Sequence, residues 1–124
     1  MPNSPAHLQY AKSDEWFDAA SGRIGISDYA QDQLSDVVFL EIRVSAGDLI
    51  EAGSIIASVE SVKAASDVLA PAGGKVAAVN TALTSTPENI NSDPYGCWFI
   101  QLEGGVAAGL LDAAAYERHC AERR

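Results

Sequence analysis

Val59-Glu60-Ser61-Val62-Lys63-Ala64-Ala65-Ser66-Asp67-Val68 is the stretch around which the chain is organised. Alternating apolar residues lead up to the lysine, and a second apolar run follows it and ends at the Pro-Ala-Gly-Gly segment, residues 71–74. This pattern predicts two strands joined by a tight turn, with Lys63 at or beside the tip and its amine in water. The alternative is that Lys63 is only a solvated surface charge, as most lysines are.

The rest of the sequence predicts a small, mainly β domain in which turns separate short strands. Strands are expected at 8–11, 15–26 (a hairpin), 37–44, 49–50, 55–60, 65–69, 75–79 and 98–102. In the strand at 37–44, every second residue from Val38 is expected on one face. The glycine pair at 73–74 is expected to form a turn, and the pair at 104–105 is expected to separate the late strand from the C-terminal helix.

Two short helices are expected, one in the N-terminal half and one at the C-terminus. Ser27 is the predicted N-cap of a helix over about 28–34, and Asp112 is that of the last helix. Leu111 and Tyr116 have the spacing of a hydrophobic staple, and the two arginines at 123–124 suit the helix dipole. Residues 1–7 are expected to be a flexible lead-in and residues 8–124 a single domain.

Composition narrows the classes of partner. The chain has 124 residues, 48% of them hydrophobic, and a formal net charge of −9. Such a charge argues against nucleic acid and against an anionic membrane surface, and no apolar run is long enough to span a membrane. The N-terminus carries no secretion or import pattern, which indicates a bacterial cytoplasmic protein, with the mitochondrial matrix as the alternative.

Conventional active-site chemistry is absent from the pattern. Two histidines, His7 and His119, and two distant cysteines give no metal-ligand spacing and no predicted catalytic residue. Cys97 and Cys120 are expected to be reduced thiols, with a single disulfide between them as the alternative. The carboxylates are expected to lie mostly on a solvated face.

With these residues in view, the chain resembles the H-protein family of the glycine cleavage system over nearly its whole length. The segment 60–68 is similar to the family's lipoyl-attachment motif, and 25–31 to its Gly-Ile-Thr-x-x-Ala-Gln segment. Further similar segments lie at 36–41, at 94–98 and at 110–116. Three residues depart from the family pattern: Asp14 stands where His is usual, Ser35 where Gly is usual, and Cys97 replaces Gly in a slightly longer turn.

The resemblance implies a lipoyl-domain-like barrel-sandwich hybrid and a non-catalytic carrier with lipoate covalently on Lys63. It implies that the arm takes an aminomethyl group from the pyridoxal-phosphate-dependent P protein to the tetrahydrofolate-dependent T protein. The FAD-dependent dihydrolipoyl dehydrogenase, the L protein, then receives the electrons. The alternative role is a relay that donates lipoyl groups to 2-oxo-acid dehydrogenase subunits.

The resemblance also implies the enzyme that modifies the lysine, a lipoyl or octanoyl transferase or a lipoate ligase, and it suggests a monomer. The residues expected to be recognised by that enzyme flank the lysine: Glu60, Ser61, Val62, Ala64 and Asp67. Some family members hold the loaded arm in a cleft, and Ser13, Glu15 and Asp67 match positions that line it. The alternative for Ser13 is a turn at a strand entry, and for Glu15 and Asp67 it is exposed charge near a hairpin.

Overall fold

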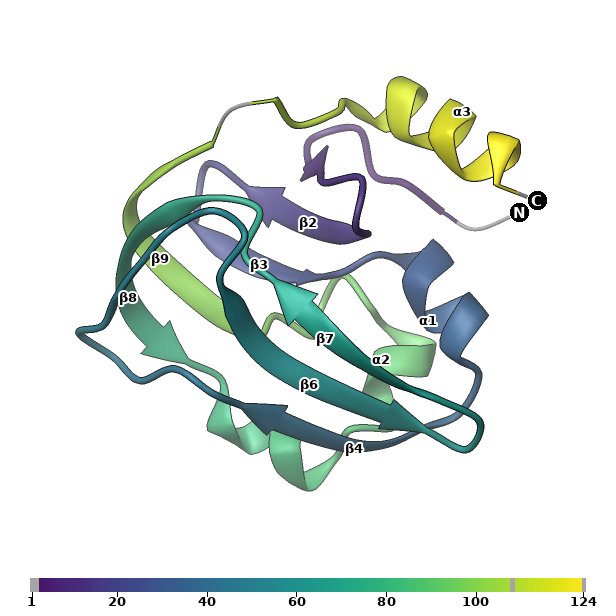
Figure 1. Ribbon diagram of the computed structural model, residues 1–124, viewed down its shortest axis with the longest axis horizontal. Helices are drawn as coiled ribbons and strands as arrows, with labels where there is room; N and C mark the ends of the chain where they lie inside the picture. The colour runs from purple at the N-terminus through teal and green to yellow at the C-terminus, as the bar shows by residue number, and fades with distance from the viewer. Residues whose placement is uncertain (1–2, 108, 124) are drawn as a thin grey trace.

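The computed structural model describes residues 3–107 and 109–123, and its strands form two antiparallel sheets (Figure 1). The larger sheet has six strands in the order β1-β2-β3-β9-β8-β5, and the smaller has three in the order β4-β6-β7. The elements are β1 (Gln9–Tyr10), β2 (Glu15–Asp18), β3 (Arg23–Ile26), α1 (Asp28–Leu34), β4 (Val37–Ile42), β5 (Leu49–Ile50), β6 (Ile55–Ser61), β7 (Ala65–Leu69), β8 (Gly73–Val79), the 3-10 helix η1 (Thr81–Ser85), α2 (Asn89–Ser92), β9 (Ile100–Val106) and α3 (Ala113–Glu122).

One hydrophobic core joins the two sheets. The larger sheet contributes Ile24 and Ile100 to it, and the smaller contributes Leu40, Ile56 and Val59. Each of these side chains is at most 2% exposed. Strand side chains alternate between faces, so each sheet needs only every second residue to be apolar to build this core. The mainly β fold with a helix in the N-terminal half and one at the C-terminus is confirmed.

Both predicted helix starts are also confirmed. The Ser27 hydroxyl accepts a hydrogen bond from the Ala30 amide at 3.1 Å, and the Asp112 carboxylate accepts one from Ala115 at 2.8 Å. These side chains satisfy amides that the first helical turn leaves without a partner. The helix α3 then packs over β1, where the rings of Tyr10 and Tyr116 stack 4.6 Å apart, and Leu111 packs against the same cluster.

The predictions for the two glycine pairs are wrong: the pair at 73–74 does not form a turn, and the pair at 104–105 does not end the late strand. Gly73 and Gly74 begin β8, and Gly104 and Gly105 lie inside β9. A Cβ atom on Gly74 would lie 3.1 Å from the Cα atom of Gly105. The glycines therefore allow two paired strands to approach closely. In the sequence, a pair of glycines that serves this purpose looks the same as a pair that forms a turn.

Leu40, Ile42 and Val44 pack on the core, so the alternation predicted for the strand at 37–44 holds there. It fails at Val38, because a β-bulge interrupts the pairing of β4 with β6 between Val37 and Phe39. The bulge puts Val37 and Leu40 in the core and leaves Val38 and Phe39 55% and 48% exposed. An extra residue in one strand moves the following side chains to the other face. The strand also ends at Ile42 rather than Val44.

Met1 and Pro2, the first two residues of the predicted lead-in, lie outside the described residues. From Asn3 the chain contacts the domain: the Asn3 amide donates to the Asp28 carboxylate at 2.7 Å, and the Tyr95 hydroxyl donates to the Asn3 carbonyl. Arg124 is also outside the described residues, whereas Arg123 contacts Asp14.

Ser35, at the C-terminal end of α1, adopts φ 66° and ψ −149°, a conformation that is almost confined to glycine. Substituting Ser35→Gly should therefore raise the free energy of unfolding by about 1 kcal/mol, after the extra flexibility of glycine in the unfolded chain is subtracted. Chemical denaturation measures this change. Ser92→Gly, in the helix α2, is the matched control and should lower stability; a loss of stability in Ser35→Gly would contradict the account of strain.

Candidate functional site

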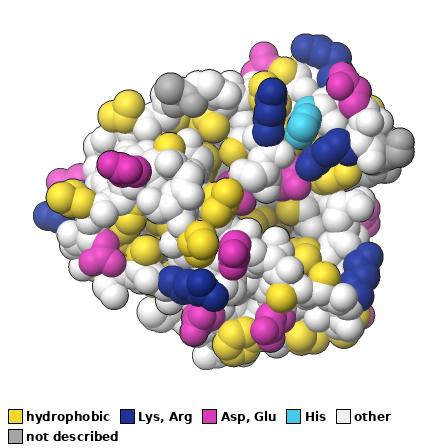
Figure 2. All heavy atoms as spheres, viewed as in Figure 1, with side chains coloured by type: hydrophobic (Ala, Val, Ile, Leu, Met, Phe, Trp, Pro, Cys, Tyr) yellow, Lys and Arg dark blue, Asp and Glu magenta, His cyan; other side chains and the backbone are white. Residues whose placement is uncertain are grey.

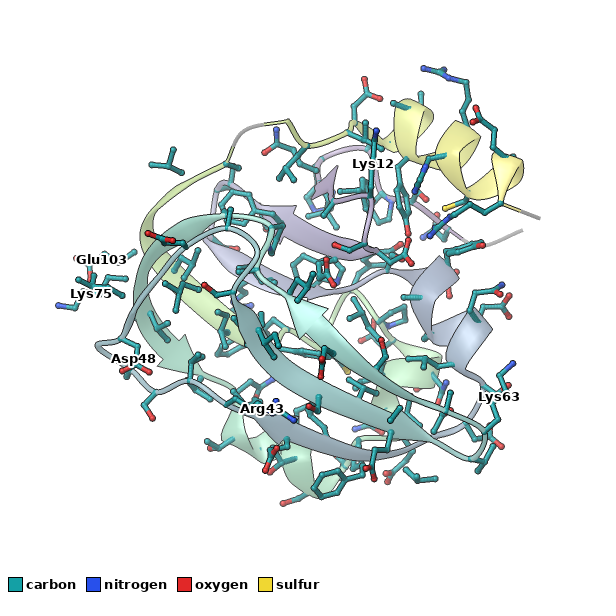
Figure 3. The ribbon with its side chains drawn as sticks, in the orientation of Figure 1. Lys12, Arg43, Asp48, Lys63, Lys75 and Glu103 are labelled. Carbon is teal, nitrogen blue, oxygen red and sulfur yellow. The ribbon has the colours of Figure 1, made fainter. Side chains whose placement is uncertain are left out.

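The β6–β7 hairpin carries Lys63 at its tip (Figure 3). The last paired residues are Glu60 and Ala65, and Ser61 closes the turn between them. The Ser61 hydroxyl accepts hydrogen bonds from the amides of Lys63 and Ala64 at 3.3 and 3.1 Å, and the Ser61 amide donates to the Ala64 carbonyl at 2.7 Å. The serine thus fixes the backbone of the turn from within.

The tip is also tied to the body of the domain. The Val62 amide donates to the Asp36 carbonyl at 3.0 Å, which joins the turn to the segment that follows α1. The Val62 side chain is 66% exposed, and Lys63 and Ala64 are exposed beside it. A rigid backbone therefore presents a free amine and its two neighbours to solvent.

The other two lysines have different settings. Lys75 lies within β8, paired with Leu49 on one side and Glu103 on the other. Lys12 lies in the turn before β2, close to α3 (Figure 3). Of the three, Lys63 alone stands at the end of a protruding hairpin (Figure 3).

A pocket of about 160 Å³ lies between α1 and β7, and the surface is hollowed below the part of the molecule that carries α3 (Figure 2). Apolar side chains form one part of its wall and polar groups the other. Its lining residues are Ser13, Asp14, Glu15, Ile26, Ala30, Gln33, Leu34, Val59, Ser66, Asp67 and Val68. The pocket therefore suits a ligand with an aliphatic body and a polar end.

Glu15 is the buried acid of this pocket, with 2% of its surface exposed. Its Oε2 atom accepts a hydrogen bond from the Leu69 amide at 3.1 Å, and its Oε1 atom accepts one from the Ser13 hydroxyl. Burial raises the pKa of Glu15 to about 7, although both hydrogen bonds favour the charged form. The expectation that the carboxylates lie on a solvated face is wrong for Glu15, as is the alternative of an exposed charge.

The structure brings the three residues predicted for the arm cleft to this one pocket, but Asp67 differs from the other two. Asp67 is exposed, pairs with Ser58, and its Oδ1 atom lies 3.4 Å from the Ser58 hydroxyl. It also lines a second, more open pocket with Phe39 and Glu60. Asp67 therefore lies at the rim, while Glu15 and Ser13 form the polar end.

Sequence reasoning missed Ser66 and the apolar wall. Ser66 pairs with the buried Val59, so both lie on the row of the hairpin that lines the pocket. The alternation of β7 held this signal, because Val68 is buried and Ser66 is two residues away. Ala30 and Leu34, from the same face of α1, complete the wall.

The cysteines form no bridge: Cys97 and Cys120 are both free and buried. Burial and the nearby Asp93 raise the pKa of the Cys97 thiol, which keeps it protonated and a poor nucleophile. Within residues 3–107 and 109–123, no group of three or more His, Cys, Asp or Glu side chains is placed to hold a metal ion. No helix in that part of the chain has the length and apolar character needed to cross a membrane.

Comparisons with known proteins agree with this geometry. Residues 8–123 match the family model described as Glycine cleavage H-protein. The chain is 50% identical over 123 residues to "Glycine cleavage system H protein 2" of Pseudomonas aeruginosa, covering 94% of this chain and 95% of the relative. It is 48% identical over 118 residues to "Glycine cleavage system H protein" of Deinococcus radiodurans, covering 94% and 97%.

The fold is similar to a solved structure, the glycine cleavage system H protein from Mycobacterium marinum. The TM-score is 0.84 at 35% identity, with 92% of this chain and 96% of the other covered. This likeness confirms the lipoyl-domain-like hybrid fold that the sequence predicts.

The raised pKa of Glu15 gives folding stability a specific pH dependence. Between about pH 4.5, the ordinary pKa, and about pH 7, the folded state holds a proton that the unfolded state has lost. Stability from this group is therefore present below pH 4.5 and is lost as the pH rises through 7. Replacing Glu15→Gln should stabilise the protein relative to wild type by about 2–3 kcal/mol at pH 8 and far less at pH 4.5.

Denaturant unfolding at the two pH values measures this difference. Glu51→Gln, on the exposed turn before β6, is the matched control. A Glu15→Gln stability difference that is the same at both pH values would show that the carboxyl is not held protonated by its burial.

Proposed function

The chain belongs to the glycine cleavage H-protein family, and we propose that Lys63 is the residue on which it carries the family's lipoyl group. Members of this family carry lipoate on a lysine and serve glycine cleavage as non-catalytic carriers, so this protein is a lipoyl carrier rather than an enzyme. The observation that supports Lys63 is its position at the tip of a hairpin whose backbone is fixed by Ser61.

The chemistry at this lysine follows from its surroundings. The terminal amine of lysine forms a stable amide with a carboxylic acid, and at the tip of the hairpin it can enter another protein's active site. When bound, the lipoyl group supplies a disulfide that accepts a one-carbon unit and electrons. The chain's own contribution is a rigid support, because a tether on a fixed point keeps its end at a high effective concentration near each partner.

We assign recognition by the modifying enzyme to Glu60, Ser61, Val62, Ala64 and Asp67, which surround the lysine. Four of them, all except Ser61, are exposed, and Ser61 determines the shape of the turn. A transferase or ligase that bound this turn would contact both the side chains and the backbone that presents the amine. The pattern of exposure therefore fits recognition of a folded hairpin rather than of an extended peptide.

The pocket between α1 and β7 is proposed to receive the arm and its aminomethyl cargo. The apolar wall fits an aliphatic chain, and Glu15 with Ser13 fits the cargo's amine, which is positively charged when protonated. A buried carboxylate is costly on its own, but an ammonium group beside it offsets that cost. Binding of the cargo should therefore favour ionised Glu15, while Asp67 adds charge at the rim.

The other components of the glycine cleavage system are its partners through family membership. In the proposal, these are the P protein, which loads the cargo, the T protein, which removes it, and the L protein, which accepts electrons. We further propose that the protein is a cytoplasmic monomer. The free cysteines fit a cytoplasmic location. The exposed apolar side chains are spread over several elements rather than gathered on one, which fits a monomer.

Intact mass and peptide mapping of the protein from its native host test the attachment site. The expected result is one lipoyl increment on Lys63, which is absent in Lys63→Arg and present in the matched controls Lys12→Arg and Lys75→Arg. An increment on another lysine, or none, would contradict the proposal. In the same cells, loss of lipoate from 2-oxo-acid dehydrogenase subunits in Lys63→Arg would indicate the relay role instead.

The arm pocket is tested by the lifetime of the cargo. Glu15→Ala removes a charged hydrogen-bond acceptor and should speed loss of the aminomethyl group from loaded protein by roughly tenfold. Asp67→Ala, at the exposed rim, should speed it by no more than about threefold. The release of formaldehyde or ammonia over time measures both rates, and an unchanged rate in Glu15→Ala would remove this residue from the pocket's function.

A further inference from the structure

Asp14 lies at the junction of the pocket and the C-terminal helix. It ends a turn in which its amide donates to the Ala11 carbonyl at 3.0 Å, and its carbonyl accepts from the Ser27 amide at 2.9 Å. Its φ angle is 83°, in the left-handed region that aspartate tolerates better than most residues. The backbone of Asp14 is therefore committed to the turn, and its side chain points away to other partners.

Those partners come from α3 and from the residue that follows it. The Tyr116 hydroxyl donates to Oδ1 of Asp14 at 2.8 Å. The Arg123 guanidinium donates to Oδ2 at 3.2 Å and to Oδ1 at 2.5 Å, so the two side chains meet in the two-pronged geometry that arginine forms with carboxylates. A lysine at 123 could make only a point contact.

The helix that supplies these donors is itself firmly placed. The Tyr116 side chain is fully buried, stacks on Tyr10, and its hydroxyl lies 2.6 Å from the hydroxyl of Ser27. The Arg123 guanidinium lies over the ring of Tyr29, 4.4 Å from its centre. These contacts fix α3 against β1 and against α1, which lines the pocket.

The helix holds the same turn at a second point. A ring nitrogen of His119 lies 3.1 Å from the carbonyl oxygen of Lys12. The turn is therefore held from α3 on both sides of Ser13, at Lys12 and at Asp14. Ser13 and Glu15, the neighbours of Asp14 in the chain, form the polar end of the pocket.

We propose that the contact of Asp14 with Arg123 and Tyr116 is a latch through which the C-terminal helix positions the Ser13–Glu15 side of the pocket. Asp14 and Arg123 are positioning residues, because they act through the turn that carries Ser13 and leads into Glu15. This inference deepens the proposed function. The effect of the latch on cargo rests on the proposal that the pocket holds the cargo. The effect of the latch on the position of Glu15 does not rest on that proposal.

The Leu69 amide reports on the latch directly. It donates to Oε2 of Glu15 from the strand β7, whereas the latch lies at the end of α3. A contact that merely held the C-terminus in place would leave Leu69 unaffected. A contact that positions Glu15 should alter the protection of this amide against hydrogen exchange.

The experiment compares Arg123→Ala and Arg123→Lys with wild type, all without lipoate, and uses Arg118→Ala on the exposed surface of α3 as the matched control. In Arg123→Ala, exchange at Leu69 should become about two- to fivefold faster relative to Val59 on the adjacent strand, the range expected for a partly exposed ion pair. Arg123→Lys should restore part of the protection, and Arg118→Ala should match wild type. Asp14→Asn, which weakens the same contact from the turn, should change Leu69 in the same direction.

Equal changes at Leu69 and Val59, or no change at either, would overturn the latch. The same variants, lipoylated and loaded with cargo, separate this inference from the proposed function. If Leu69 changes and cargo is also lost faster, both stand. If Leu69 changes and the cargo lifetime does not, the latch stands and the pocket's role in holding cargo fails.

Discussion

The carboxyl group of Glu15 is the constraint on which the site depends. Its backbone belongs to β2 in the larger sheet, and its Oε2 atom accepts from Leu69 on β7 in the smaller one. A carboxyl buried without donors would be strongly unfavourable, so its hydrogen bonds to Leu69 and Ser13 fix where the two sheets can meet at this edge. Because its pKa is about 7, the group stays near the balance between its neutral and charged forms, and a cation in the pocket would shift that balance.

The molecule separates the two tasks of a carrier. Presentation of the lysine depends on local geometry, since Ser61 closes the turn and the Val62 amide ties it to Asp36. The proposed protection of the cargo depends instead on long-range geometry, because the pocket is assembled from β2, α1 and β7. If the pocket holds the cargo as proposed, a change in the pocket alters how long the cargo survives without altering how the lysine is displayed to partners.

The features that could be predicted from the sequence are those that residues close together in the chain determine. The hairpin around Lys63, the caps at Ser27 and Asp112 and the apolar alternation of β4 from Leu40 onward are local features, and the structure contains them. The bulge in β4 was not predictable, because it arises from pairing with β6, and the two glycine pairs could equally have formed turns.

The site shows the same limit. The family resemblance placed Ser13, Glu15 and Asp67 near one another, but the burial of Glu15 depends on a strand 54 residues further along the chain. The contact between Asp14 and Arg123 spans 109 residues, and no local pattern indicates it.

The most direct test of whether the loaded arm lies in the pocket between α1 and β7 is an NMR spectrum of the lipoylated protein carrying a ¹³C-labelled aminomethyl group. If the arm lies in the pocket, nuclear Overhauser contacts run from the labelled methylene to the methyl groups of Ala30 and Val68. Sharp methylene signals without such contacts would show that the arm remains in solvent and does not enter the pocket.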